Sequence, residues 1–517
     1  MDSAKPSILR NILVKMLLFC VSIICLRFAY VVTIRGESCD IGDFCFFSLP
    51  ENLNFVTAAG TVSASAVISS DKVRSRSVSG DPKYIDIWNS KDSRKAVQFY
   101  SSVFQDLISE GFLSPGSKSL CVETPIGLDV FAMREIGVSD AIGVAKKASK
   151  PLVVSYKNSR QPFGDNTFDF VFSGGGSIDR LKSFVQFADE IARTLKPEGY
   201  LVVHTQSNDS YSLNSFISLF NCCKFIRSRE IAVFDSSMPY IREIVVRKES
   251  GGIIRKSYGK GGNSVSKCSV LGYMQKLIQN AEPLIAEEPM KPWLTLKRNI
   301  QNIKYLPSVV DISFKGRYVY VDVGARSYGS SIGSWFRKQY PKQNRTFEIY
   351  AIEADKAFHE EYKLKKGVHL LPYAAWIKNE TLFFEINHDP GDDPEEKGGK
   401  GKGMGRIKRL RSSNSLASRV DKIKGFDFTN WLKNTVSERD FVVMKMDVEG
   451  TEFDLIPRLF DTGAICLIDE IFLECHYNRW QRCCPGQRST KYEKTYRQCL
   501  DLFTSLRDSG VLVHQWW

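Results

Sequence analysis

The feature that most constrains this 517-residue chain is a series of apolar segments between residues 317 and 476, each followed by a turn or a helical pattern. The segments YVYVDVG, FEIYAIEAD, VHLLPYAAW, FVVMKMDVEG and AICLIDEIFLECH are each typical of a buried strand. Strands that alternate with helices predict a parallel sheet covered by helices. We therefore expect a doubly wound α/β domain, whose ligands bind beyond the carboxyl ends of its strands.

A second α/β pattern precedes this one. The stretches DNTFDFVFSGGG (165–176) and LKPEGYLVV (195–203) resemble the class I methyltransferase domain of the type 11 kind. The glycine-rich acidic loop expected for that class is replaced by VETPIGLD, and the predicted second strand ends in GVA without a carboxylate for a ribose. We therefore predict a degenerate methyltransferase-like domain with a structural role.

The N-terminal residues predict an attachment to a membrane. Lys5, Arg10 and Lys15 precede an apolar run at residues 16–34, which contains a single charge, Arg27. Its length is close to the roughly 20 residues that span a bilayer, and the basic flank favours a cytosolic N-terminus. A cleaved signal peptide and a buried core helix are the alternatives.

The predicted organisation has six parts. They are a cytosolic tail (1–15), a transmembrane signal anchor (16–34), a stem (35–90), the degenerate domain (91–248), a connector (249–310) and the C-terminal methyltransferase domain (311–517). The fold class is thus α/β, with two Rossmann-like, class I methyltransferase-like domains after the membrane helix. We expect a single-pass type II protein of the Golgi or another secretory membrane.

Other features agree with a lumenal chain. N-x-[ST] sequons stand at Asn208, Asn344 and Asn379, so we expect a glycoprotein. A cysteine cluster at Cys475, Cys483, Cys484 and Cys499 can form disulfides in an oxidising lumen, or remain as thiols. The formal net charge of +13 favours acidic partners, but no nucleic-acid-binding motif accompanies it, and no nucleic acid is expected.

Polar residues follow several strands of the C-terminal domain. Asp322 and Gly324 open a turn after the first strand, and Glu353 follows the second, where a carboxylate can accept the hydroxyls of a ribose. A later strand leads into Asp447, Glu449 and Glu452, and the next into Glu474 and His476. Carboxyl ends of parallel strands share one edge of a sheet, so these side chains are expected to converge there.

Residues 317–480 resemble the FkbM-type S-adenosylmethionine-dependent methyltransferases, through VDVGA, IEAD, LPYAAW, MKMDVEGTEFDLI and LIDEIFLECH in that order. With the predicted anchor, the whole chain resembles membrane-anchored plant methyltransferase-like proteins. The resemblance implies a Rossmann-like fold, S-adenosylmethionine as cofactor and O-methylation of a glycan or another hydroxyl compound. It assigns Asp322, Gly324 and Gly329 to the cofactor loop and Glu353 to the ribose.

The same resemblance places Asp447 beside the methyl donor and the acceptor hydroxyl, with Glu449 in support. Removing the hydroxyl proton requires a base or a metal. His476 is our candidate base, and a divalent ion held by Asp447, Glu449, Glu474 and His476 is the alternative. We expect a site without a metal.

The degenerate first domain and an enlarged glycine loop keep a second function open. The family has three residues between its loop glycines, whereas Gly324 and Gly329 enclose four, including the large Arg326 and Tyr328. The charged stretch 387–418 is either a solvated loop or a lid over the site. A non-catalytic pseudo-methyltransferase that acts as a scaffold or partner-binding subunit is therefore the alternative to an enzyme, and a lumenal glycosyltransferase is a third.

Overall fold

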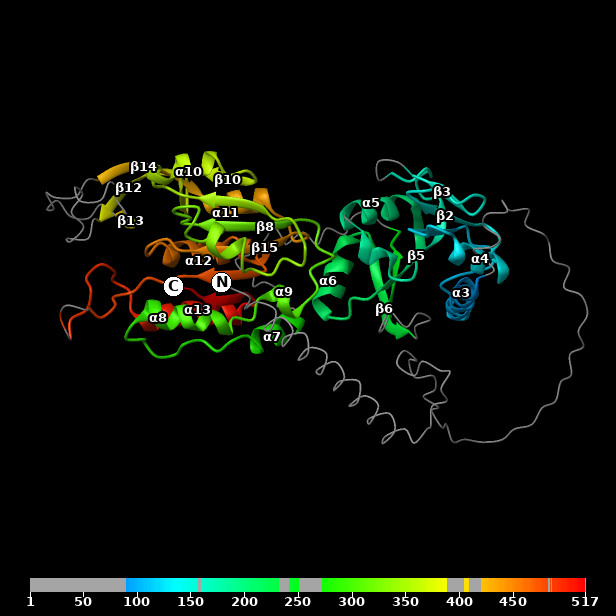
Figure 1. Cartoon of the computed structure of the whole chain (residues 1–517), viewed down its shortest axis with the longest axis horizontal. Coiled ribbons are helices and arrows are strands. Elements are labelled where there is room, and N and C mark those ends of the chain that lie inside the picture. The colour runs from blue at the N-terminus through cyan, green and yellow to red at the C-terminus, as the bar shows by residue number, and fades with distance from the viewer. Residues whose placement is uncertain are drawn as a thin grey trace, which may run out of the picture. The chain divides into compact units, whose positions relative to one another are not determined.

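The computed structural model describes residues 90–156, 160–181, 183–231, 241–250, 272–387, 404–408, 420–481, 484 and 486–516. They form two α/β lobes, which we call the N-terminal lobe (residues 90–250) and the C-terminal lobe (residues 272–516) (Figure 1). The predicted membrane segment (16–34) and stem lie outside the described residues, except for Ser90. No helix in the described part of the chain has both the length and the apolar character needed to span a bilayer.

The N-terminal lobe is built on a seven-stranded sheet in the order β3-β2-β1-β4-β5-β7-β6. Its strands are β1 (Ser119–Val122), β2 (Ala141–Ala145), β3 (Val153–Ser155), β4 (Phe168–Ser173), β5 (Leu195–Thr205), β6 (Cys223–Ile231) and β7 (Ile241–Lys248). Its helices are α3 (Lys91–Ser109), α4 (Leu128–Glu135), the 3-10 helix Ser177–Arg180, α5 (Phe184–Thr194) and α6 (Ser210–Leu219). Strands β1 to β5 pair in parallel, and β7 runs antiparallel to both β5 and β6. The expectation of a parallel sheet is therefore confirmed, with one reversed strand near an edge.

The turn after β1 is held by hydrogen bonds and close packing within the N-terminal lobe. Thr124 donates a hydrogen bond to Asp129 at 2.5 Å and accepts one from the amide of Gly127 at 3.1 Å. Gly127 has φ +80°, and a Cβ there would lie 2.8 Å from a methyl group of Val153. The glycine of this turn is thus required for packing against β3.

The C-terminal lobe contains a six-stranded sheet in the order β10-β9-β8-β15-β16-β17, in which every neighbouring pair is parallel. The strands are β8 (Tyr318–Val323), β9 (Glu348–Ile352), β10 (Val368–Leu371), β15 (Phe441–Met446), β16 (Glu470–Leu473) and β17 (Leu512–Gln515). Counted within the sheet this is the Rossmann order 3-2-1-4-5-6. The predicted doubly wound α/β fold is confirmed, and its topological switch point lies between β8 and β15.

Helices and connecting segments cover this sheet. They are α7 (Gly272–Gln279), α8 (Pro292–Asn299), α9 (Leu306–Val309), the π-helix Ile332–Phe336, α10 (His359–Lys363), α11 (Phe428–Thr435), α12 (Glu452–Asp461) and α13 (Tyr496–Asp508), with 3-10 helices at Ile300–Asn302, Lys356–Phe358 and Ala464–Leu467. In GSSIGSWFRKQY (residues 329–340) the apolar residues have helical spacing, which predicts one helix. The structure corrects this to the short π-helix, beside which the Tyr328 ring packs against Gly333.

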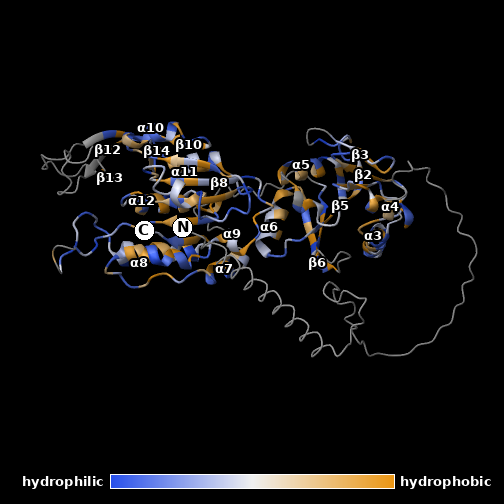
Figure 2. Ribbon diagram, viewed as in Figure 1, coloured by the Kyte–Doolittle hydropathy of each residue, from blue (hydrophilic) through white to orange (hydrophobic). Residues whose placement is uncertain are grey.

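The strand β8 separates two hydrophobic cores because its side chains alternate between the faces of the sheet. Val319, Val321 and Val323 pack in one core with α11, α12 and α13. Tyr318 and Tyr320 pack in the other core with the π-helix and the segment around α9. In Figure 2 the hydrophobic residues gather in the sheets and helices of both lobes, whereas many connecting loops are hydrophilic. Burial on both faces explains why β8 and β15 read as almost continuous apolar runs.

A separate four-stranded sheet is formed by β11 (Ala374–Trp376), β12 (Glu380–Asn387), β13 (Met404–Lys408) and β14 (Val420–Asp427), in the order β11-β14-β12-β13. Strand β13 lies inside the stretch 387–418 that was predicted to be a loop. The structure corrects that prediction for residues 404–408, which pair antiparallel with β12. The parts of the stretch at 388–403 and 409–418 lie outside the described residues.

Buried charges attach the connector to the sheet. His514 in β17 contacts Glu282 of the connector at 2.7 Å and Glu470 of β16 at 3.0 Å, and all three residues are buried. Glu470 also accepts hydrogen bonds from the amide of Leu306 and from the hydroxyl of Tyr340. Burial by itself would lower the pKa of His514, but its hydrogen bonds to the two carboxylates raise that pKa to about 9.

This cluster predicts a dependence of stability on pH. Because the folded-state pKa of His514 lies above its unfolded value of about 6.5, the stabilisation is complete below that pH and is lost as pH rises through about 9. We expect His514→Gln to remove about 3 kcal/mol of this dependence between these two pH values. Urea unfolding of wild type and variant at matched pH values measures the difference. Parallel curves for the two proteins would contradict the assignment.

Candidate active site

A cavity of about 800 Å³ lies at the carboxyl ends of the C-terminal strands, on both sides of the switch point. Gly324 and Glu353 line it from the loops after β8 and β9, and Asp447, Glu474 and His476 line it from the loops after β15 and β16. Trp293, Ile407 and Trp516 complete other parts of its wall. A volume of this size is typical of sites for small-molecule ligands and cofactors.

The turn after β8 requires glycine at position 324. Gly324 has φ +80°, and a Cβ on it would lie 1.8 Å from the carbonyl oxygen of Asp447. The turn is also held by β9, because the amides of Gly324 and Ala325 both donate to the carbonyl of Ile352, at 3.0 and 3.1 Å. Gly324 therefore lets the ends of β8 and β15 meet at the cavity wall.

The other predicted glycine has a different environment. Gly329 is exposed, has no positive φ, and a Cβ on it would meet nothing within 4 Å. Gly329 and Tyr328 are both absent from the residues that line the cavity. The Tyr328 ring lies near the ring of Tyr362 and the guanidinium of Arg337. Arg326 does line the cavity and adopts φ +51°, an uncommon conformation for a residue with a side chain.

Asp322 acts behind the wall of the cavity. It is fully buried in β8, accepts a hydrogen bond from Ser331 and lies 3.6 Å from the amine of Lys445. Its Oδ1 atom has no hydrogen-bond partner among the described residues. Burial raises the pKa of Asp322, and the charge of Lys445 opposes that rise. Asp322 therefore holds the loop through Ser331 and lies beside Lys445, without lining the cavity itself.

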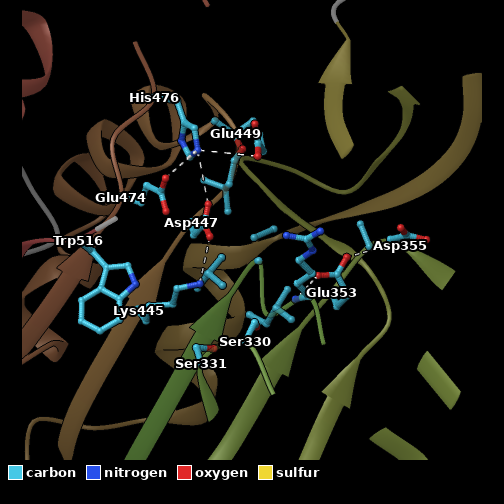
Figure 3. A pocket seen from close by; sticks show the side chains of 18 of the residues that line it. Ser330, Ser331, Glu353, Asp355, Lys445, Asp447, Glu449, Glu474, His476 and Trp516 are labelled. Atoms are coloured by element: carbon cyan, nitrogen blue, oxygen red, sulfur yellow. Dashed lines mark hydrogen bonds and ion pairs between the residues drawn. The ribbon is translucent and has the colours of Figure 1, made fainter. Parts of the chain in front are cut away.

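Glu353 joins the turns after β8 and β9. One of its carboxylate oxygens accepts from the amide of Arg326 and the other from the amide of Asp355, both at 2.6 Å. Burial raises the pKa of Glu353 to about 7, even though the two amide hydrogen bonds oppose the shift. In Figure 3 Glu353 and Asp355 lie at one end of the cavity, away from His476.

A cluster of charges forms the opposite end. The Nε2 atom of His476 lies 3.5 Å from Asp447, 3.8 Å from Glu474 and 4.0 Å from Glu449 (Figure 3). Glu452, the first residue of α12, accepts from the amide of His476 at 2.7 Å and contacts its Nδ1 at 3.3 Å. Figure 3 shows these side chains converging from two neighbouring loops. The order of residues predicted from the sequence therefore does bring them together.

Each of the three acidic residues near Nε2 of His476 also contacts a cation. Lys445 lies 3.3 Å from one oxygen of Asp447, Lys491 lies 3.0 Å from one oxygen of Glu449, and Arg479 lies 3.5 Å from Glu474. The hydroxyl of Tyr492 donates to the same Glu449 oxygen that Lys491 contacts. Both lysine-bound carboxylates present their other oxygen toward His476.

The cluster shifts the protonation of its members. Burial alone would lower the pKa of His476, but the charges of Glu452, Glu474 and Glu449 raise it to about 10. Burial, assisted by Asp447, raises the pKa of Glu474 to about 7. Burial would also raise the pKa of Asp447, but Lys445 and His476 together lower it. In the free protein at neutral pH the imidazole is therefore protonated and Asp447 is ionised.

Several site residues were missed by the sequence reasoning. Lys445 is a buried charge within the apolar strand β15. A lysine in an otherwise hydrophobic run is unusual, and it could have indicated that Lys445 belongs to the site. Lys491, Tyr492 and Trp516 also line the cavity, but they follow the last predicted strand and carry no motif. Within the described residues, the predicted cysteine cluster contains a disulfide between Cys475 and Cys499, near the site.

Comparisons with known protein families give one match in each lobe. The sequence model of a methyltransferase domain matches residues 138–203, and that of a domain of unknown function, DUF7870, matches residues 278–381 and 406–517. No curated protein has a significantly similar sequence. The methyltransferase match begins after β1 and the turn that follows it, so it leaves out the loop that departs from the class pattern.

Solved methyltransferases are also similar in structure. A SAM-dependent methyltransferase from Aquifex aeolicus is 15% identical, covering 32% of this chain and 98% of its own, with a TM-score of 0.25. The 1,6-didemethyltoxoflavin-N1-methyltransferase from Burkholderia thailandensis, solved with S-adenosylhomocysteine bound, is 12% identical, covering 32% of this chain and 83% of its own, with a TM-score of 0.26. At such scores the fold assignment rests on strand order and the family match. The N-terminal lobe, which carries the match, has a class I methyltransferase fold, and the match supports S-adenosylmethionine, the methyl donor of this class, as a cofactor of the chain.

The two loop glycines provide a matched test of the turn after β8. We expect Gly324→Ala to lower the free energy of unfolding by more than about 2 kcal/mol, because the methyl group meets the carbonyl of Asp447 and the backbone is left-handed. Gly329→Ala, at an exposed position with free space, should change it by less than about 1 kcal/mol. Chemical unfolding measures both. Similar losses for the two variants would show that the turn does not make this close approach.

Proposed function

We propose that the C-terminal lobe is an S-adenosylmethionine-dependent O-methyltransferase of the FkbM type, acting on a hydroxyl of a glycan or a small molecule. The observation that carries this proposal is one cavity at the switch point, with Glu353 at one end and the charged cluster around His476 at the other. The separation leaves room for a cofactor and an acceptor side by side. A methyl transfer requires this kind of positioning.

The cofactor end has groups suited to a nucleoside. Gly324 leaves the wall free of a side chain, and Glu353 presents a carboxylate that can accept hydrogen bonds from ribose hydroxyls. Asp322 and Gly329 contribute indirectly in this proposal, by supporting and shaping the loop. When bound, S-adenosylmethionine supplies an electrophilic methyl group.

The cluster end would hold the acceptor. Asp447 and Glu449 orient the hydroxyl, and one carboxylate removes its proton. We assign that role to Glu474 in place of His476, because the raised pKa of His476 leaves its imidazole already protonated in the free protein. His476 then stabilises the charge that develops on the acceptor oxygen.

A specific observation favours the alternative function, a non-catalytic scaffold. Both carboxylate oxygens of Glu353 already accept backbone hydrogen bonds, and one of these comes from Arg326 in the enlarged loop. A ribose would have to share those oxygens. If it cannot, the lobe keeps the fold without the cofactor, as we propose for the N-terminal lobe.

We also propose that the chain is a type II membrane protein of the Golgi or another secretory membrane, anchored through residues 16–34. The disulfide between Cys475 and Cys499 supports an oxidising compartment. The sequon residues Asn208, Asn344 and Asn379 are all exposed, as attachment of a glycan requires. The basic flank of the apolar run supports the orientation.

Binding of S-adenosylmethionine distinguishes the enzyme from the scaffold. By isothermal titration we expect binding to the wild type, about tenfold or more weakened in Glu353→Gln. Asp355→Asn, at the same end of the cavity, should bind within about threefold of wild type. Because the pKa of Glu353 is raised to about 7 and only the ionised form accepts hydrogen bonds through both oxygens, affinity should increase between about pH 6 and about pH 8.

The possible negative results have different meanings. No binding by the wild type at about 1 mM ligand would favour the scaffold. Binding that is unchanged in Glu353→Gln would retain the methyltransferase but refute the ribose assignment.

Glycosylation tests the orientation of the chain. Expressed in a eukaryotic secretory system, the protein should carry a glycosidase-sensitive glycan on exposed Asn344. Thr346→Ala removes the sequon and should increase gel mobility, whereas Thr346→Ser preserves it and should migrate as wild type. If Thr346→Ala and the matching change at Asn379, Thr381→Ala, both leave mobility unchanged and glycosidase has no effect, the lumenal placement is refuted.

A further inference from the structure

We propose that Asp447, Glu449 and His476 form a binding site for a divalent cation of the Mg²⁺ and Mn²⁺ class, at the acceptor end of the cavity. One atom from each of these residues lies within 4.8 Å of the others. The arrangement of these ligands and their surroundings supports such a site.

The orientation of His476 is the first support. Its Nδ1 and its amide both face Glu452, a contact that directs Nε2 into the cluster. The side chain is only 4% exposed, and its Nε2 lies between the carboxylates of Asp447, Glu474 and Glu449 at 3.5, 3.8 and 4.0 Å, which are longer than ordinary hydrogen bonds. A carboxylate that holds the far nitrogen of an imidazole, with the near nitrogen facing other acids, is the arrangement found at metal-binding histidines.

The spacing of the ligand atoms is the second support. With metal–ligand bonds of about 2.1 Å, neighbouring ligands of an octahedral ion lie about 3.0 Å apart and opposite ligands about 4.2 Å apart. The separations from Nε2 to Asp447 and Glu449 are 3.5 and 4.0 Å, which fall between those values. A cation can therefore reach all three atoms after shifts of a few tenths of an ångström.

The balance of charge is the third support. The described residues joined to this cluster at ion-pair distances include five carboxylates, Asp322, Asp447, Glu449, Glu452 and Glu474, and three cationic side chains, Lys445, Arg479 and Lys491. In the free protein the protonated imidazole leaves one negative charge uncompensated. A divalent cation that binds Nε2 displaces this proton, which leaves two negative charges for the cation to neutralise. Lys445 and Lys491 each occupy one oxygen of a ligand carboxylate and leave the other for the ion.

The ligand chemistry selects the class of cation. Two carboxylate oxygens and one imidazole, without a thiolate, suit a hard ion such as Mn²⁺. Its effect would be to lower the pKa of an acceptor hydroxyl bound beside it. The O–H bond then breaks, its proton passes to the carboxylate of Glu474, and the oxygen keeps the electron pair. This catalytic role depends on the proposed methyl transfer, whereas binding of the cation does not.

Mn²⁺ is the probe for this site. Titration of the metal-free full-length protein with Mn²⁺, followed by isothermal calorimetry and by the loss of the free-ion electron paramagnetic resonance signal, should show one site per chain. Asp447→Asn and Glu449→Gln should each weaken binding about tenfold or more. Glu353→Gln, a carboxylate at the far end of the same cavity, should bind Mn²⁺ as wild type does.

Thermal unfolding provides the second readout and a check on folding. Mn²⁺ should raise the melting temperature of wild type and Glu353→Gln but not that of Asp447→Asn. If Asp447→Asn does not fold, the result for Glu449→Gln decides. No binding by the wild type at about 1 mM Mn²⁺, or equal binding in all variants, overturns the cation site. A protein that binds S-adenosylmethionine but not Mn²⁺ refutes this inference alone, and the opposite result refutes the proposed function.

Discussion

The parallel pairing of β8 with β15 is the interaction on which the candidate site depends. The amide of Asp447 donates to the carbonyl of Val323 at 2.9 Å, so the pairing continues to the point where both strands end. The chain then turns at Gly324, whose backbone lies in close contact with the carbonyl of Asp447. The loop predicted for a cofactor and the loop that carries the acidic cluster meet in one cavity because no side chain separates them.

Charged side chains are buried at this switch point at a cost in stability, and packing alone does not explain why they are there. Lys445 and Asp322 lie inside the two central strands, where an isolated charge is strongly unfavourable. The amine of Lys445 and the carboxylate of Asp322 have opposite charges but lie 3.6 Å apart, which is longer than a hydrogen bond. One oxygen of Asp322 has no hydrogen bond among the described residues. A structural core would be at least as stable with apolar residues at both positions. The proposed site would account for this arrangement, because it needs Asp447 ionised and held in place.

Much of the framework was predictable because it depends on local patterns. The buried strands around Val321 and Met444 appear as apolar runs, and the acidic residues at their ends follow from the rule for parallel sheets. The helix predicted for residues 329–340 was too long, because only Ile332–Phe336 form the π-helix. The packing of the Tyr328 ring against Gly333 is also a contact that periodicity does not reveal. Strand β13 was missed because its residues are charged and glycine-rich, and it is ordered only by pairing with β12.

The sequence by itself determined the α/β class, the order of the polar strand ends and the candidate residues Glu353, Asp447 and His476, because these properties depend on periodicity and chain order. The tertiary structure alone decided how those residues are used. It placed Glu452 behind His476, Lys445 beneath Asp447 and Tyr328 outside the cavity wall. It also separated the essential Gly324 from the unconstrained Gly329. Such distinctions depend on distances between segments far apart in the chain, and local sequence patterns carry no information about those distances.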